Sequence, residues 1–207
     1  MGTFESHITI QANNKTALSI FQQLCQELKV KCLLIELPEG INNFQPMTSL
    51  YHKGSYERVL IEVNSLAELI REQGFKVTRV KIEALITNNL VPINDEEAKK
   101  LPESNYFEFH VLVNLLNKEA MEQLKAICRE HQAHLSQNAF KKSVEGIKQY
   151  FVTMRLYKVG KQTAKAHFSK LLTELKQQGF KLSNRLQEYI IYDSNTLLDT
   201  GWIEPIL

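Results

Sequence analysis

The chain contains one segment twice. TFESHITI at residues 3–10 returns as YFEFHVLV at residues 106–113, which matches Glu5 with Glu108 and His7 with His110 at a spacing of 103 residues, from position 7 to position 110. Such a long internal period constrains the architecture more than any single motif, because both copies must form the same supersecondary unit. We therefore expect two halves that fold alike.

A second match extends the repeat beyond its first strand. QGFK at residues 73–76 returns at residues 178–181, and Glu83 matches Glu188 at a spacing of 105 residues, from position 83 to position 188. Hydrophobic periods of two and of 3.6 residues predict the order strand, helix, strand, strand, helix, strand in each copy. This order predicts an α+β fold, a tandem duplication of a ferredoxin-like βαββαβ unit with antiparallel sheets and helices on one face.

The predicted domains follow from the repeat. Residues 1–90 form the first ferredoxin-like lobe, residues 91–104 the linker, and residues 105–207 the second lobe with a C-terminal tail. The linker region is rich in Asn, Pro and acidic residues, which favour turns. The spatial relation of the two lobes is left open by the sequence.

Charge and hydropathy exclude several classes of partner. The formal net charge is only +2 and basic residues form short pairs, so nucleic acid, which needs a clustered cationic face, is not expected. No apolar stretch has the length of a membrane span and no leader-like segment opens the sequence, so we expect a soluble cytoplasmic protein without a membrane partner. The three cysteines form no CxxC pair and are expected to be reduced.

Alternation on the first strands predicts a charged face in each lobe. Phe4, Ile8 and Ile10 should face the helices, which turns Glu5 and His7 onto the open face of the sheet. The same alternation turns Glu108 and His110 outward in the second lobe. The fourth strand, beside the first, carries Glu83, with Glu188 at the matching place.

Four of these side chains form a candidate metal site. If the two open faces meet, His7, His110, Glu83 and Glu188 converge, and two imidazoles with two carboxylates suit a divalent transition metal such as Zn²⁺, Mn²⁺, Fe²⁺ or Ni²⁺. Glu5 and Glu108 are candidate ligand-binding residues that would support the metal ligands. The alternative is structural, since matched Glu and His can be inherited by both copies and form in-strand ion pairs.

The four matched positions resemble those of the glyoxalase and vicinal-oxygen-chelate superfamily. Its paired modules draw one His from each first strand and one Glu from each fourth strand, and the resemblance implies a metal between the lobes. This chain departs from that pattern by a helix predicted between its third and fourth strands. The YFEFHV strand and the YDSNxxLDxGW tail at residues 192–202 resemble a set of uncharacterised bacterial proteins, which implies a shared fold and no transferable activity.

Other functions stay open, because no catalytic signature is present. Each predicted third strand adds a candidate ligand-binding residue, His52 as an acid–base group and Arg155 as a clamp for a carboxylate or phosphate. His7-Ile8-Thr9 has the spacing of a two-histidine phosphoesterase, but Leu112 takes the place of the hydroxyl residue in the second copy.

The main alternative to a small-molecule or metal site is a non-catalytic module. In that case the open sheet faces bind another protein, or a second copy of this chain in a homodimer.

Overall fold

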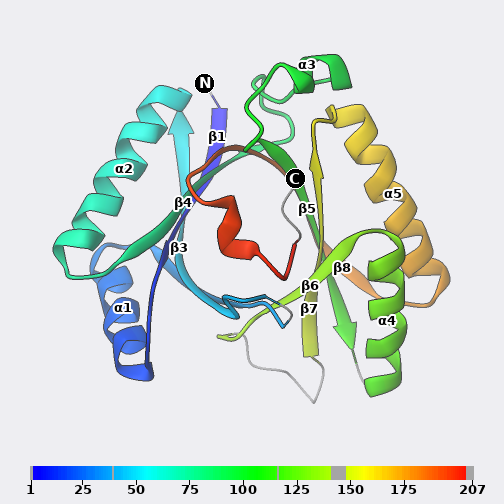
Figure 1. Ribbon diagram of the computed structural model, residues 1–207, viewed down its shortest axis with the longest axis horizontal. Coiled ribbons are helices and arrows are strands. Elements are labelled where there is room, and N and C mark those ends of the chain that lie inside the picture. Colours follow the sequence, from blue (N-terminus) through cyan, green and yellow to red (C-terminus); the bar gives the residue numbers. More distant parts are fainter. Residues whose placement is uncertain (1, 39, 116, 141–147, 204–207) are drawn as a thin grey trace.

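The computed structural model describes residues 2–38, 40–115, 117–140 and 148–203 (Figure 1). Its elements, in chain order, are β1 (Gly2–Ile10), α1 (Lys15–Glu27), β2 (Lys31–Glu36), β3 (Phe44–Gly54), α2 (Tyr56–Glu72), β4 (Val77–Leu85), α3 (Asp95–Lys99), β5 (Tyr106–Leu115), α4 (Lys118–Glu130), β6 (Ala133–Asn138), β7 (Lys148–Tyr157), α5 (Lys161–Gln177), β8 (Leu182–Asp193) and the 3-10 turn η1 (Thr196–Asp199).

The fold is mixed α+β, and its strands form one closed antiparallel barrel. Around the barrel the strands follow the order β1-β3-β2-β6-β7-β5-β8-β4. The helices α1, α2, α4 and α5 lie outside the barrel, and the segment that contains η1 lies across its interior in the view of Figure 1. The predicted lobes therefore share one sheet, in which residues 1–90 and 105–207 each supply four neighbouring strands.

The two halves are joined at two places where an edge strand of one half pairs with an edge strand of the other. We call these places seams. The strands β2, β4, β6 and β8 would each be an edge of an isolated half, with a row of unpaired backbone groups. At one seam β4 pairs with β8 from Lys81–Asp193 to Leu85–Glu188. At the other, β2 pairs with β6 at Ile35–Asn138 and Glu36–Gln137, and the Ala139 N–H donates to the Leu34 carbonyl. Barrel closure satisfies these edges.

The strands separate an apolar outer face from a polar inner face. Phe4, Ile8 and Ile10 on β1 are at most 2% exposed and belong to the core between barrel and helices, together with Phe107 and Phe109 on β5. The sequence alternation predicted this side for them. The open sheet faces of the two halves consequently face one another across the barrel interior.

Local signals account for the helix boundaries. Asn14 and Asn117 cap α1 and α4 by accepting a hydrogen bond from the backbone N–H three residues ahead, and Ser55 caps α2 in the same way. Gly74 and Gly179 follow α2 and α5 with positive φ, a conformation that favours glycine. The predicted linker contains the short helix α3. None of the described helices combines the length and the apolar character needed to cross a membrane.

Candidate metal centre in the barrel interior

A cavity of about 210 Å³ lies inside the barrel. Seven of the eight candidate site residues from the sequence line it, namely Glu5, His7, Glu83, Glu108, His110, Arg155 and Glu188. They come from the strands β1, β4, β5, β7 and β8, so both halves contribute. Barrel closure, which the sequence left open, brings the two charged faces together.

Three side chains of the first half form a compact group with metal-ligand chemistry. One ligand atom each from Glu5, His7 and Glu83 lie within 4.8 Å of one another. His7 Nε2 lies 3.7 Å from Glu5 Oε1 and 3.6 Å from Glu83 Oε2. Ligands about 2.1 Å from a tetrahedral Zn²⁺ ion are separated by about 3.4 Å, so these spacings suit one ion with little movement.

The orientation of His7 suits a metal ligand. Its Nδ1 lies 3.0 Å from the carbonyl oxygen of Thr48, which can only accept, so Nδ1 carries the hydrogen and donates it. In the neutral ring the lone pair is then on Nε2, which faces the two carboxylates. Metal-bound histidines are commonly fixed by such a hydrogen bond from the second nitrogen.

Charge around His7 favours its protonated form when no ion is bound. Burial disfavours the imidazolium, but the charge and hydrogen bond of Glu83, with the charge of Glu5, outweigh burial and raise the pKa of His7. Glu5 is held by a hydrogen bond of 2.6 Å from the Ser49 hydroxyl. A proton on Nε2 therefore occupies the position between the carboxylates where a cation is stabilised.

Glu188 contributes a protonated carboxyl from the second half. Burial, the charge of Glu83, a hydrogen bond with Glu83 and the charge of Glu5 raise the pKa of Glu188 to about 10. Two carboxylates in contact cannot both be charged at low cost, so one retains a proton. Glu188 is 3% exposed, and its Oε1 is both buried and without a hydrogen-bond partner among the described residues.

Lys81 links the two halves at this centre. Its Nζ lies 2.6 Å from Glu83 Oε1 and 2.9 Å from Glu108 Oε1. Burial disfavours the ammonium, but the charges of Glu108 and Glu83 outweigh burial, and the pKa of Lys81 stays well above its usual value. Lys81 is therefore charged and holds one oxygen of Glu83 while the other oxygen faces His7.

His110 lines the same cavity but lies outside the three-residue group. Its Nε2 is 3.3 Å from Glu108 Oε1, and its Nδ1 is 2.8 Å from the Thr153 hydroxyl. The structure thus pairs each first-strand histidine with the carboxylate two residues before it, and brings Glu5, predicted as a supporting residue, among the potential metal ligands. His110 faces the cavity as a second imidazole.

His52 belongs to β3, and its side chain lies on the other side of the sheet, facing α2. Its Nε2 is 2.8 Å from the Ser6 hydroxyl, and its Nδ1 is 3.3 Å from Glu62 on α2. Ser, His and Glu connected in this order resemble a hydrolase triad. Ser6 is fully buried, however, and neither residue lines the interior cavity, so the connection stabilises packing of α2 against the barrel.

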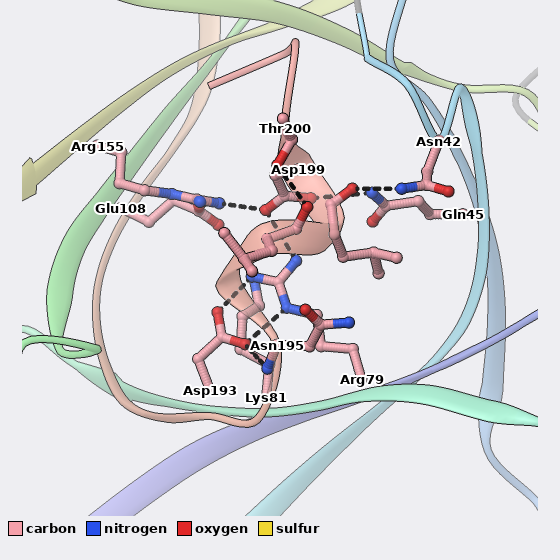
Figure 2. A network of polar contacts seen from close by, with 12 residues as sticks. Asn42, Gln45, Arg79, Lys81, Glu108, Arg155, Asp193, Asn195, Asp199 and Thr200 are labelled. Atoms are coloured by element: carbon pink, nitrogen blue, oxygen red, sulfur yellow. Dashed lines mark hydrogen bonds and ion pairs between the residues drawn. The ribbon is translucent and has the colours of Figure 1, made fainter. Parts of the chain in front are cut away.

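Arg155 belongs to a network that fixes the C-terminal segment inside the barrel (Figure 2). The carboxylate of Asp199 accepts hydrogen bonds of 2.9 Å from Arg79, from Arg155 and from the amide of Gln45. Burial disfavours the charged carboxylate, but the two guanidinium groups outweigh it and lower the pKa of Asp199. Arg155 was predicted to clamp a carboxylate, and the carboxylate it holds here comes from the chain itself.

A second acid completes the network. Asp193, at the end of β8, accepts from Arg79 Nε at 2.9 Å and from the Tyr106 hydroxyl at 2.7 Å. Sequence analysis did not assign Asp193 or Asp199 to the interior, and it did not assign Lys81 a role. The alternation on β4 places Lys81 beside Glu83 and was a usable signal, whereas nothing in the local pattern of the tail indicates that Asp199 is buried.

Comparisons with known proteins assign no family. No protein-family model matches the chain, and no curated protein matches it. Among solved structures, the chain is similar to the small subunit of acetolactate synthase from Thermotoga maritima, at 9% identity over 93% of this chain and 96% of that chain, with a TM-score of 0.32. At this TM-score the similarity supports no conclusion about fold or function, so the chemistry of the cavity must carry the functional argument.

Proposed function

We propose that this protein binds a divalent transition metal ion inside its barrel, with Glu5, His7 and Glu83 as ligands and Glu188 as a fourth ligand from the second half. One imidazole with several carboxylates suits Zn²⁺, Mn²⁺, Fe²⁺ or Ni²⁺. The observation that carries the proposal is the arrangement of His7, whose Nδ1 is committed to Thr48 while Nε2 faces two carboxylate oxygens at 3.6 and 3.7 Å.

The charge of the interior supports a divalent ion. Without an ion, the raised pKa values of His7 and Glu188 favour the protonated form of both side chains. Exposed side chains of these types bind protons less strongly. One M²⁺ ion can replace both protons without changing the total charge of the interior, because ligands bind metals in their deprotonated forms. The site can therefore exchange two protons for one ion without leaving a buried charge uncompensated.

The bound ion would supply Lewis acidity to an oxygen ligand. The chain's own residues position it: Thr48 orients His7, Ser49 orients Glu5, and Lys81 holds the second oxygen of Glu83. His110, on β5 of the second half, adds a second imidazole to the lining of the cavity. This set supports a ligand-binding or metal-dependent catalytic role, and the metal itself is the part to test first.

The decisive experiment measures metal affinity in matched variants. After treatment with EDTA, the protein is titrated with Zn²⁺ and with Mn²⁺ by isothermal titration calorimetry. His7→Ala and Glu83→Gln should each weaken binding more than about 100-fold, since even loss of a residue that orients a metal ligand costs 10–100-fold. His110→Ala is the matched control, as the equivalent imidazole outside the group, and should change affinity less than threefold.

Proton release provides an independent measurement. Titrations at pH 6 in buffers with different ionisation enthalpies should give about two protons released per ion, one from His7 and one from Glu188. Glu188→Gln should lower this number by about one. Absence of stoichiometric binding by the wild type would refute the proposal, and equal weakening by His110→Ala would favour the four-residue site predicted from the sequence.

We also infer that the two halves descend from duplication of a ferredoxin-like unit. Each half has the element order βαββαβ, and each half places its strands in equivalent order within the barrel. The contacts of His7 with Thr48 and of His110 with Thr153 occur at equivalent places. A shared origin explains why Glu-x-His occurs twice. Among the described residues, three potential ligands gather in the first copy.

The other functions from the sequence receive less support. A protein or second copy cannot dock flat on the open sheet faces, because those faces line the barrel interior. A phosphoesterase would need unpaired cations near the two histidines, whereas the buried cations Arg79, Lys81 and Arg155 are each paired with carboxylates. The added carboxylates of Glu5 and Glu83 would repel a phosphate group.

A further inference from the structure

The cavity has two chemically different walls. The neighbouring strands β5, β8, β4 and β1 form a charged wall, which carries the proposed metal ligands, Lys81 and Glu108. The opposite wall, formed by β3, β2, β6 and β7, combines polar side chains, among them Lys31 and Arg155, with a group of apolar ones. Its apolar lining residues are Leu33, Ile35, Leu37, Met47 and Phe151.

One end of the cavity is covered by the C-terminal segment, and the other reaches solvent. The inward-facing residues of β3 show the direction: Gln45 binds Asp199, Ser49 binds Glu5, and Tyr51, next along the strand, is 60% exposed. Leu186 of β8 also lines the cavity and is 39% exposed. At this end Tyr51 lies beside the proposed ligand Glu5, whereas Met47 and its strand partner Leu33 lie further along the barrel, between Ser49 and Gln45.

Among the described residues, the three buried cations that line the cavity are each paired with carboxylates. Arg79 is paired with Asp193 and Asp199, Arg155 with Glu108 and Asp199, and Lys81 with Glu83 and Glu108. A polar head would therefore be recognised by the proposed ion itself. The apolar part of the ligand would lie against the apolar residues of the opposite wall, where burial of each methylene is favourable.

We infer that the natural ligand of this site is a small amphiphile, with an oxygen-donor head at the proposed metal ion and an unbranched or compact apolar body along Leu33, Met47, Phe151 and Leu186. This inference rests on the proposed metal centre. Beyond that centre, it specifies the class of ligand, the orientation of the ligand in the cavity and the residues that contact its apolar part. The affinity of the site should then depend on the length of the apolar chain of the ligand.

A homologous series of alkyl hydroxamic acids tests the inference. These compounds bind divalent metals through two oxygens, and the series from acetohydroxamic to hexanohydroxamic acid changes only the apolar body. Binding to the Zn²⁺-loaded protein is measured by isothermal titration calorimetry. Affinity should rise about 3- to 4-fold for each added methylene, as expected for burial of a CH₂ group.

Variants locate the apolar body. Leu186→Asn, which replaces a partly exposed side chain, should reduce the gain per methylene to less than about twofold and leave the affinity for acetohydroxamic acid within threefold of wild type. Leu33→Asn, on the opposite wall, should act in the same way. Leu69→Asn is the matched control, since Leu69 is 47% exposed on α2 and does not line the cavity.

The outcomes separate this inference from the metal proposal. If Zn²⁺ does not bind, the metal centre fails and the inference with it. If Zn²⁺ binds but acetohydroxamic acid does not, or if affinity is independent of chain length, the ligand class is wrong while the metal centre stands. A full gain per methylene in both Leu186→Asn and Leu33→Asn would show that the apolar body lies elsewhere.

Discussion

Glu83 and Glu188 form a buried pair of carboxyl groups in the barrel interior. The two groups share one proton across the β4–β8 seam, and Glu188 keeps it because burial and the neighbouring charges raise its pKa to about 10. Glu83 remains charged, since Lys81 and His7 outweigh the effect of burial and lower its pKa. The pair therefore combines a hydrogen-bond donor and a charged acceptor at one place.

We expect Glu188→Gln to stabilise the metal-free protein at high pH. The folded state holds a proton that the unfolded state releases above about pH 4.5, so the contribution of Glu188 is complete below that pH and is lost as pH rises towards 10. The variant has no proton to lose. Its advantage in free energy of unfolding should grow between pH 5 and 9 by at most about 1.4 kcal/mol per pH unit, measured by urea denaturation in EDTA.

A surface carboxylate supplies the control for that experiment. Glu68 lies on α2 and pairs with Arg71 at the solvent-exposed surface. Glu68→Gln should differ from wild type by the same small amount at every pH in the series. Parallel pH profiles for wild type and Glu188→Gln would show that Glu188 does not retain a proton.

At the residue scale the sequence predicted seven of the residues that line the interior cavity. Alternation placed Glu5, His7, Glu108 and His110 on the open face, and the structure places all four in the cavity. The choice among them depended on distances across strands, which alternation does not contain. The side of the sheet that His52 faces could not be predicted, because alternation on the third strand does not show which of its residues face the helices.

The C-terminal segment forms hydrogen bonds with residues that are far from it in the sequence. Besides the bonds of Asp199, Asn42 donates to the carbonyl of Leu198, and the indole N–H of Trp202 donates to the carbonyl of Leu135. Trp202 packs with Leu37 and Ile203 in a small apolar cluster. The sequence predicted packing for this tail, but its buried charge could not be predicted, since the partners lie on β3, β4 and β7.

Asp199→Ala should destabilise the protein by about 3–5 kcal/mol. Removing one partner of a buried ionic network leaves the guanidinium groups of Arg79 and Arg155 without part of their compensation. Guanidinium chloride denaturation at pH 7 measures the change. Leu197→Ala, in the same 3-10 turn but 64% exposed, should stay within about 0.5 kcal/mol of wild type. A similar loss in both variants would indicate a general effect on the turn.

The whole molecule is a single barrel built from two halves that depend on one another. Ion pairs cross between the halves from Lys81 to Glu108 and from Arg79 to Asp193 and Asp199, all in the buried interior. An isolated half would expose its edge strands and its charged inner face to solvent. The order of elements could be predicted from the internal repeat, whereas the closure could not, because edge pairing between the halves leaves no local signal.

We expect unfolding to be one cooperative transition. Since the interior network and both seams join the halves, neither half should persist after the other unfolds. The single tryptophan, Trp202, reports on the C-terminal segment, and far-UV circular dichroism reports on helices of both halves. Urea curves from the two signals should coincide within error. Two separated transitions would instead indicate lobes that fold independently.

The position of Asp199 after all eight strands has a consequence for biosynthesis. A ribosome releases every strand of the barrel before it releases the acid that neutralises Arg79 and Arg155. Until that residue emerges, the nascent sheet holds two guanidinium groups with incomplete compensation, which opposes early closure. The last carboxylate of the interior network is therefore added after the strands that carry its two guanidinium partners.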